Sequence, residues 1–225
     1  KITYGIKEPA DIQASDIRNK GNHGFTFTAK IFDQAIPVKL PQIGYCNIYN
    51  ALAALATGHS LGITGKEMNL GLKNYQQIPQ RNEQIHYEGM TLINDTYNAN
   101  PQSMREALKT LKEINTQGKR FFIIGDMLEL GPLSEPAHHE LGQEIARSNV
   151  DYLVTVGPLA SLAAESAKAN VRQQLQIEKF NTHNEAVNYL LRKVKKGDCL
   201  LVKGSRGSKM ENVVQEFLKP KKQNN

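Results

Sequence analysis

The chain has 225 residues, of which 40% are apolar and 22% charged, and its net charge is +6. This composition is ordinary for a soluble globular protein, and no apolar run approaches the ~20 residues needed to span a bilayer. Because most basic residues are scattered and form no patch with interleaved aromatics, we expect no nucleic-acid partner. Cys46 and Cys199 lie far apart in unlike contexts, which favours two free thiols in a reducing compartment, the cytoplasm.

The first third of the chain alternates short apolar stretches with polar turns. Apolar residues at every second position from Phe25 to Ile31 predict antiparallel strands, with Gly21 and Gly24 around the preceding turn. The apolar spacing then becomes helical, and Pro79 marks a break. We therefore predict helices at 48–61 and 65–75 and a hinge at 76–82.

Beyond the hinge, strand-like and helical patterns alternate five times. Such alternation predicts a mostly parallel sheet with right-handed crossovers and with helices on both faces. The predicted fold class is therefore α/β, with a Rossmann-like domain after the hinge. The expected strands are 90–95, 120–125, 152–157, 177–180 and 198–203, and the expected helices are 101–115, 134–148, 158–169, 183–195 and 207–218.

The segment 94–104 concentrates hydrogen-bonding side chains on one predicted strand-to-helix turn. It holds the carboxylate of Asp95, the phenol of Tyr97 and several asparagine amides. Open α/β sheets bind ligands at such turns, beyond the carboxyl ends of their strands. Pro101 suits the first turn of a helix, and Asn100 before it is a good N-cap. We therefore predict a ligand site at this turn.

Two later turns bring further polar groups to predicted strand ends. Lys203, Ser205 and Arg206 precede the last predicted helix, and cations and a hydroxyl at a helix N-terminus favour an anion site. Asp126 and Glu129 either position a substrate amine or water, or cap the helix that follows them. The chain has no G-x-x-x-x-G-K-[ST] loop, and no G-x-G-x-x-G follows a predicted strand.

Four segments in the same order resemble the signatures of the Mur ligases. The resemblance is to the branch of that family that adds D-alanyl-D-alanine to UDP-N-acetylmuramoyl-tripeptide. One such segment would be weak support, whereas four in the same order, spread over most of the chain, make a strong match. The segments are 44–54, 94–104, 125–131 and 202–206 with 210–211.

The resemblance implies a reaction and its cofactors. ATP would phosphorylate the terminal carboxylate of UDP-N-acetylmuramoyl-tripeptide, and the amine of D-alanyl-D-alanine would attack the acyl phosphate, in peptidoglycan precursor synthesis. ATP and Mg²⁺ are the implied cofactors, and the family's P-loop, magnesium ligands and carbamylated lysine lie upstream of these residues. Residues 1–78 then correspond to the C-terminal part of a central ATP-binding domain, and 79–225 to a C-terminal Rossmann-like ligase domain.

We expect such a chain to be a monomer without membrane insertion, and inactive as a ligase by itself. The resemblance also implies the role of each site residue. An amide pair can read an adenine edge, Asp95 can bind a ribose diol, and a guanidinium at the hinge can neutralise the transferring phosphoryl group. The expected residues are Arg81 and Lys203 for catalysis, Asn47, Asn50, Arg81, Asp95, Tyr97 and Asn98 for ATP, and Asn100, Asp126, Ser205 and Arg206 for the substrates, with no metal ligand among them.

Two residues depart from the pattern of the family, and a third matches it without entering the predicted site. Cys46 stands where the family has a histidine, so the role of that imidazole does not transfer to this chain. Gln80 stands where the family has a glycine, which gives the hinge loop less freedom in φ. His138 resembles a family histidine, but an isolated histidine on a helix is more often structural, and we leave it out of the predicted site.

Other interpretations of the same residues stay open. Asn47 and Asn50 could be a helix cap and a polar surface position, and Arg81 could be a surface ion-pair partner. A folylpolyglutamate synthase-like ligase has a similar architecture, but residues 97–101 fit the dipeptide-adding branch better. A non-catalytic module that binds a nucleotide or substrate is the remaining alternative.

Overall fold

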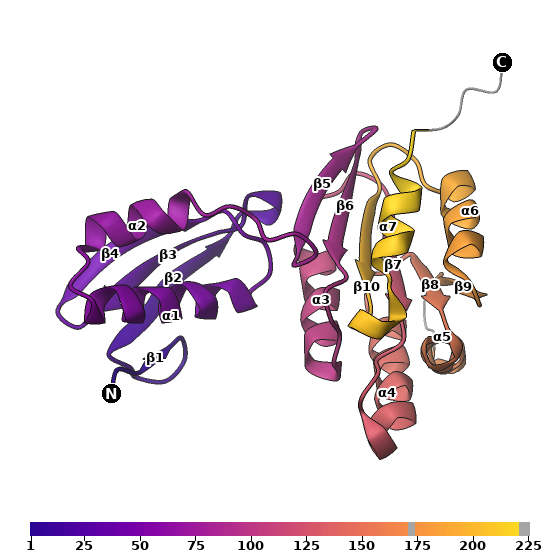
Figure 1. The fold of residues 1–225 in the computed structure, drawn as a ribbon, viewed down its shortest axis with the longest axis horizontal. Coiled ribbons are helices and arrows are strands. Elements are labelled where there is room, and N and C mark those ends of the chain that lie inside the picture. The colour runs from indigo at the N-terminus through magenta and orange to yellow at the C-terminus, as the bar shows by residue number, and fades with distance from the viewer. Residues whose placement is uncertain (171–173, 221–225) are drawn as a thin grey trace. The chain divides into compact units, whose positions relative to one another are not determined.

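A computed structural model of the chain describes residues 1–170 and 174–220. The chain forms two compact units, Lys1–Gln77 and Ile78–Asn225, each with its own sheet (Figure 1). Within the described residues, no helix has both the length and the apolar character needed to cross a membrane.

The first unit is a four-stranded sheet that packs against two helices. The sheet has the order β1-β2-β3-β4, in which β1 and β2 are parallel and the other pairs are antiparallel. The antiparallel strands and both helices predicted for this part are confirmed. The strands are Tyr4–Gly5 (β1), Ile12–Asn19 (β2), Phe25–Ile31 (β3) and Gln34–Leu40 (β4), and the helices are Cys46–Ser60 (α1) and Gly65–Lys73 (α2).

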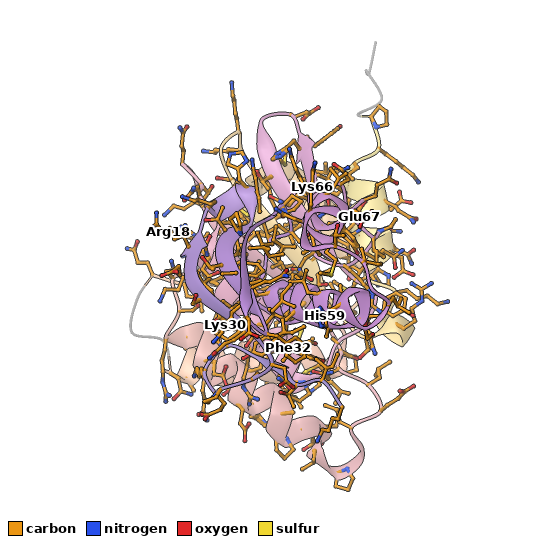
Figure 2. The ribbon with its side chains drawn as sticks, turned by 90° about the vertical axis from the view of Figure 1, so that its left-hand side faces the viewer. Arg18, Lys30, Phe32, His59, Lys66 and Glu67 are labelled. Atoms are coloured by element: carbon orange, nitrogen blue, oxygen red, sulfur yellow. The ribbon has the colours of Figure 1, made fainter. Side chains whose placement is uncertain are left out.

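Residue spacing explains why these elements pack as they do. The buried side chains of β3 alternate along the strand and form one core with the side chains of α1 that are three and four residues apart. The helix α2 begins with a capping box, in which Thr64 and Glu67 bond each other's backbone N–H groups. Figure 2 labels Phe32 at the β3–β4 turn and His59 of α1, whose ring centroids lie 4.7 Å apart.

The second unit is a six-stranded sheet with the order β5-β6-β10-β7-β8-β9. The edge strand β5 is antiparallel to β6, and the other neighbours are parallel. The strands are Glu83–Tyr87 (β5), Met90–Asp95 (β6), Arg120–Gly125 (β7), Tyr152–Val156 (β8), Gln176–Phe180 (β9) and Cys199–Lys203 (β10). The helices are Pro101–Glu113 (α3), Ser134–Ala146 (α4), Pro158–Asn170 (α5), His183–Lys193 (α6) and Glu211–Phe217 (α7).

Helices cover both faces of this sheet (Figure 1). The helices α3, α4 and α5 pack on one another and on one face, while α6 and α7 pack together on the other face. The central strand β10 is buried along its whole length, as expected for a parallel strand that is covered on both sides. The predicted α/β class, the mostly parallel sheet and the helices on both faces are confirmed.

Two details of the second unit differ from the prediction. The edge strand β5 was not expected, because its five residues are only half-buried and include polar side chains. The last helix was expected to begin at 207, but a 3₁₀ turn at Arg206–Ser208 and a left-handed Lys209 (φ +50°) delay it to Glu211. The turn after β10 is therefore not the N-terminus of an α-helix, so the predicted helix start there is wrong, while anion binding by its side chains stays a prediction.

The contact between α4 and α5 requires a glycine. A Cβ atom added at Gly142 would lie 2.2 Å from the carbonyl oxygen of Ala163 and 2.8 Å from the Cβ of Ser166. We expect Gly142→Ala to lower the free energy of unfolding by roughly 1–3 kcal/mol, because the backbones of two packed helices must separate. Gly71→Ala in α2 is the control, since no atom lies within 4 Å of its Cβ, and it should stabilise by roughly 0.5–1 kcal/mol. Denaturant titration of both variants checks this, and an unchanged Gly142→Ala midpoint would contradict it.

Candidate functional site

The topology of the second unit singles out the carboxyl end of β10. In the sheet, β10 lies between β6 and β7. The chain leaves β6 and β7 toward α3 and α4 on one face, but it leaves β10 toward α7 on the other face. The turn after β10 is therefore flanked by two topological switch points, where open α/β sheets bind ligands.

A buried ion pair joins the ends of β6 and β10. The Nζ atom of Lys203 lies 2.6 Å from Oδ2 of Asp95 and donates to the carbonyl oxygen of Asn98 at 2.8 Å. The side chains of Lys203 and Asp95 are only 4% and 14% exposed. The lysine was expected to be catalytic, but its ammonium group is engaged inside the protein. We interpret Lys203 as a residue that positions Asp95 and the turn after β6.

The other oxygen of Asp95 reaches the hinge. Its Oδ1 accepts a hydrogen bond from the backbone N–H of Asn82 at 3.1 Å, and the backbone N–H of Tyr97 donates to the carbonyl of Gln80 at 3.1 Å. Gln80 and Asn82 both have left-handed φ angles, +63° and +48°. Gln80 thus keeps a conformation that glycine adopts without cost, which explains why a glycine suits this position in the family. These bonds fix the backbone on both sides of Arg81.

Two guanidinium groups lie against one tyrosine ring at this edge of the sheet. The Cζ atom of Arg81 is 4.0 Å from the ring centroid of Tyr97, and that of Arg206 is 5.9 Å from it. Arg206 also donates to Oε1 of Gln80 at 2.8 Å. Arg81, Tyr97 and Arg206 are exposed, so their polar groups can reach a ligand. Two cations on one rigid aromatic platform form a group that can bind phosphate or carboxylate oxygens.

Ser205 holds three turns of the site together. Its hydroxyl donates to the carbonyl of Ala99 at 3.1 Å and accepts from the N–H of Leu128 at 2.9 Å. Its own N–H donates to the carbonyl of Asp126 at 3.0 Å. The side chain is buried, and these bonds link the turns that follow β6, β7 and β10. Ser205 was expected to bind substrate, whereas this geometry indicates a positioning role.

Asp126 and His138 shape the turn after β7. Oδ1 of Asp126 accepts the N–H of Ala160 at 2.7 Å, so this carboxylate caps α5 and not the helix that directly follows it in the chain. His138 is fully buried, and its Nε2 accepts the N–H of Met127 at 3.0 Å. Its burial and this bond support a structural role for His138. The sequence predicted that Asp126 either binds substrate or caps the helix near Ser134, and the bond of its carboxylate with Ala160 fits neither alternative.

The predicted asparagines fall into two groups. In the first unit, Nδ2 of Asn50 donates to Oδ1 of Asn47 at 2.9 Å, and Nδ2 of Asn47 donates to the carbonyl of Ile43 at 2.7 Å. The two amides therefore lie on one face of α1, as their spacing predicted. In the second unit, Asn100 caps α3 by accepting from the N–H of Ser103 at 2.8 Å, and Asn98 is exposed beside Tyr97 in the chain.

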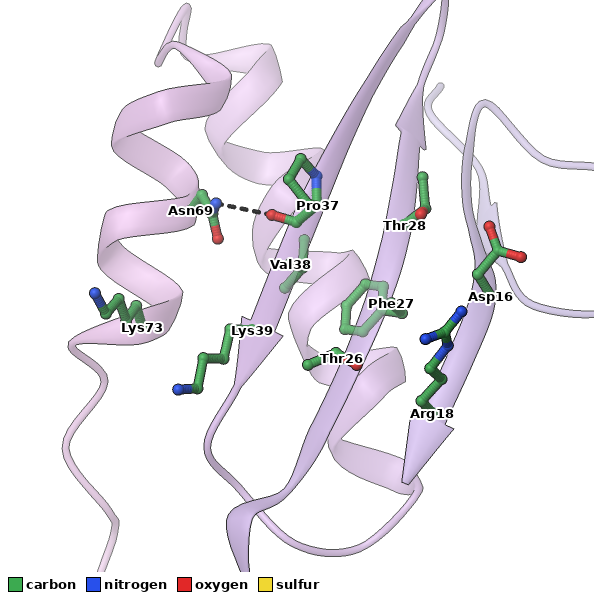
Figure 3. Close-up of a pocket in the computed structure, with 10 residues that line it drawn as sticks. All are labelled: Asp16, Arg18, Thr26, Phe27, Thr28, Pro37, Val38, Lys39, Asn69 and Lys73. Carbon is green, nitrogen blue, oxygen red and sulfur yellow. Dashed lines mark hydrogen bonds between the residues drawn. The ribbon is translucent and has the colours of Figure 1, made fainter. Parts of the chain in front are cut away.

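A separate groove lies on the sheet of the first unit, with a volume of about 530 Å³ (Figure 3). Asp16 and Arg18 of β2, Lys39 of β4 and Lys73 of α2 line it, and Asn69 of α2 donates to the carbonyl of Pro37 at its edge. None of the residues predicted from the sequence lines this groove. It belongs to the packing of α2 on β4 and is not part of the candidate site.

The two cysteines differ sharply in exposure, and this difference can be tested. Cys46 is exposed at the start of α1, whereas Cys199 is buried in β10, where burial raises the pKa of its thiol to about 12. A raised thiol pKa favours the neutral form, so Cys199 carries almost no thiolate at pH 8. We expect iodoacetamide at pH 8 to alkylate Cys46 alone in the folded protein and both cysteines in denaturant. Mass spectrometry checks this, and double labelling of the folded chain would contradict it.

The side chains at this edge fit a phosphate-bearing ligand better than a metal ion. Arg81 and Arg206 supply exposed cations, while no described group of three histidine, cysteine, aspartate or glutamate side chains could hold a metal. The sequence reasoning missed Gln80 and Glu211 as parts of the site. Both contact Arg206, at 2.8 Å and 3.5 Å, and no local pattern in the sequence shows such tertiary contacts.

The fold and the cluster at the carboxyl edge of β10 define a Rossmann-like α/β protein with a candidate ligand site at its switch points, preceded in the chain by a smaller α/β unit. Comparison with known families gives the particular group. The profile of the Mur ligase, glutamate ligase domain, matches residues 80–206, and that of the Mur ligase middle domain matches residues 1–58. The chain belongs to the Mur ligase family.

Several relatives share one activity in their names. The UDP-N-acetylmuramoyl-tripeptide–D-alanyl-D-alanine ligase of Bacillus subtilis is 32% identical over 96% of this chain and 47% of its own length. That of Buchnera aphidicola (Baizongia pistaciae) is 34% identical over 97% of this chain and 46% of its own length. The chain therefore spans about half the length of the curated relatives it matches.

Solved structures agree with this assignment. A crystal structure of MurF from Acinetobacter baumannii has a TM-score of 0.87 and 31% identity, and covers 97% of this chain and 47% of the other. The structure of the MurF ligase from Thermotoga maritima in complex with ADP has a TM-score of 0.81 and 26% identity, and covers 97% of this chain and 48% of the other. The recognition of the family from the four segments is confirmed.

Proposed function

We propose that this chain provides the end of the ATP-binding domain, residues 1–78, and the C-terminal domain, residues 79–225, of an ATP-dependent ligase. The ligase adds D-alanyl-D-alanine to UDP-N-acetylmuramoyl-tripeptide and forms ADP and phosphate, as the names of its relatives suggest. Both substrates and ATP would be met in the cytoplasm, and the enzyme would act as a monomer. The observation that supports the proposal most is the Arg81–Tyr97–Arg206 cluster at the switch point of the sheet.

The cluster suits the first chemical step. A carboxylate is a poor electrophile, so one of its oxygens first attacks the γ-phosphorus of ATP and forms an acyl phosphate. Negative charge spreads over the transferring phosphoryl group, and an exposed guanidinium such as that of Arg81 can stabilise it. The cation–π contact with Tyr97 limits the positions that Arg81 can adopt, so the guanidinium charge stays near the ring before the phosphate binds.

The second step forms the amide. The neutral amine of D-alanyl-D-alanine attacks the carbonyl carbon of the acyl phosphate, the new C–N bond forms, and the C–O bond to the phosphate breaks. Phosphate leaves with the oxygen that the carboxylate supplied, and the nitrogen gives up one proton to the phosphate or to solvent. Water would compete with the amine, so exclusion of water from the site favours amide formation. ATP and Mg²⁺ remain the proposed cofactors, and the similar ligase of Thermotoga maritima was solved with ADP. When bound, Mg²⁺ would neutralise phosphate charge.

The remaining predicted residues have supporting roles in this proposal. Asn47 and Asn50 would contact adenine, and Asp95 would bind the ribose while Lys203 and Asn82 hold its carboxylate in place. Tyr97 and Asn98 would line the nucleotide side, and Arg206 would bind the carboxylate of a substrate. Ser205, Asn100 and Asp126 would keep the three turns in register.

The test is phosphate release by the protein encoded by the complete open reading frame. The assay contains ATP, Mg²⁺ and UDP-N-acetylmuramoyl-tripeptide, and compares D-alanyl-D-alanine with D-alanine alone and with glutamate plus folate. We expect release that depends on the dipeptide. Release only with glutamate and folate would move the protein to the folylpolyglutamate synthase-like ligases, and no release with any acceptor would leave a binding module.

A further inference from the structure

We propose that Glu211, the first residue of α7, binds the ammonium group of the acceptor amine. This inference rests on the proposed ligase function and assigns a residue that the sequence analysis placed in no role. The side chain of Glu211 is 16% exposed and lies at the same edge of the sheet as Arg206. Its Oε1 atom is 3.5 Å from Nη1 of Arg206.

One oxygen of the Glu211 carboxylate accepts no hydrogen bond from the described part of the protein. Among the described residues, its Oε2 atom is buried and has no hydrogen-bond partner. The 3.5 Å contact of Oε1 is longer than the 2.7–2.9 Å typical of a strong charge-assisted hydrogen bond. A carboxylate oxygen that is withdrawn from water without a donor is unfavourable. Rotation of the carboxylate group, whose side chain is 16% exposed, would bring this oxygen to a donor from a ligand and would stabilise it.

Two neighbouring carboxylates, those of Asp95 and Glu83, already accept hydrogen bonds from the protein. Asp95 accepts from Lys203 and from the N–H of Asn82. Oε2 of Glu83 accepts from the N–H of Gln80 and from Nδ2 of Asn94, both at 2.9 Å. Of Asp95, Glu83 and Glu211, Glu211 is thus the one with a buried oxygen atom that has no donor among the described residues.

The charge pattern around Glu211 matches a zwitterion. Arg206 presents an exposed guanidinium, which suits a carboxylate, and the adjacent Glu211 suits an ammonium group. The acceptor dipeptide of the proposed reaction has both groups. Binding its ammonium end at Glu211 would place the future nucleophile beside Arg206 and Arg81, where the acyl phosphate forms. The ammonium group would give one proton to the Glu211 carboxylate or to solvent, and the neutral amine would then attack.

The experiment compares the dipeptide with a version that lacks the amine. The complete protein is assayed as wild type, as Glu211→Gln and as the control Glu216→Gln. Glu216 is a half-buried residue of α7 whose side chain is 41% exposed and forms its ion pair with Lys219 among the described residues. The probes are D-alanyl-D-alanine as substrate and propionyl-D-alanine as competitive inhibitor. We expect Glu211→Gln to raise KM for the dipeptide about 10- to 100-fold, as loss of a charged hydrogen bond predicts.

The same variant should leave KM for ATP and the inhibition constant of propionyl-D-alanine within about twofold of wild type, because neither contains the ammonium group. Glu216→Gln should behave as wild type. If the variant weakens binding of the dipeptide and of the inhibitor equally, or changes neither, the proposed role of Glu211 is overturned. The proposed ligase function still stands in that case, provided that the wild-type protein releases phosphate only with the dipeptide. Wild-type protein without that release would overturn both. If Glu211→Gln melts at a lower temperature than wild type, Glu211→Asp is assayed as a second variant, because it keeps the negative charge. Glu211→Asp should still bind the dipeptide more tightly than propionyl-D-alanine, and loss of that preference would also overturn the role of Glu211.

Discussion

Asp95→Asn is expected to lower the free energy of unfolding of the second unit by about 3–5 kcal/mol, because it leaves the buried ammonium of Lys203 without a counter-charge. The two side chains are 14% and 4% exposed, so water cannot replace the lost partner. The hinge also loses a charged acceptor for the N–H of Asn82. Hydrogen exchange of the β6 and β10 amides, followed by mass spectrometry, measures the effect within this unit.

Two controls separate the buried ion pair from a general effect of charge loss. Glu165→Gln removes one partner of the exposed Lys179–Glu165 pair, whose side chains are 48% and 56% exposed, and should cost less than about 1 kcal/mol. Asp95→Asn combined with Lys203→Met removes both buried charges and should recover part of the loss. A single Asp95→Asn variant as stable as Glu165→Gln would show that the pair does not hold the strand ends together.

Arg81→Ala is expected to lower kcat for dipeptide-dependent phosphate release in the complete protein by about 10³-fold or more, the scale of a guanidinium that stabilises a transferring phosphoryl group. Arg81 is exposed, and its described side-chain contact is with the ring of Tyr97, so the melting temperature should barely change. Arg81→Lys should also be strongly impaired, since an ammonium lacks the planar fork of a guanidinium.

Arg192→Ala is the matched control for this prediction. Arg192 is an exposed arginine near the end of α6, a helix that packs on the face opposite α3. Its replacement should leave kcat and KM unchanged. If Arg81→Ala lowers kcat less than tenfold, Arg81 does not stabilise the phosphoryl group, and the surface ion-pair interpretation of this residue becomes the better one.

Much of the fold could be predicted from the sequence because its elements have strong local signals. Residues 121–124 of the strand β7 are a continuous apolar run, and α3 begins with both an N-cap asparagine and a proline. The strand β5 lacks such a signal, since it lies at an edge with polar side chains. A two-residue turn at Glu88 and Gly89, with φ of +48° and +80°, joins β5 to β6, and a glycine at that spacing is the one local hint.

The candidate site was only partly accessible to such reasoning. Strand ends and residue types indicated which turns meet at one edge, and the segment match supplied roles for Arg81 and Asp95. What each side chain contacts depends on residues more than a hundred positions away, as for Lys203 with Asp95 or Ser205 with Ala99. Those contacts, and the free oxygen of Glu211, follow from the tertiary structure alone.

In the proposed reaction, a carboxylate is activated by phosphorylation before an amine attacks it. The most direct measurement uses UDP-N-acetylmuramoyl-tripeptide labelled with ¹⁸O in its terminal carboxylate, together with ATP, Mg²⁺, D-alanyl-D-alanine and the complete protein. The account predicts that each released phosphate contains one ¹⁸O atom, because the carboxylate oxygen that attacks ATP leaves with the phosphate. Unlabelled phosphate, formed while the dipeptide is consumed, would contradict it.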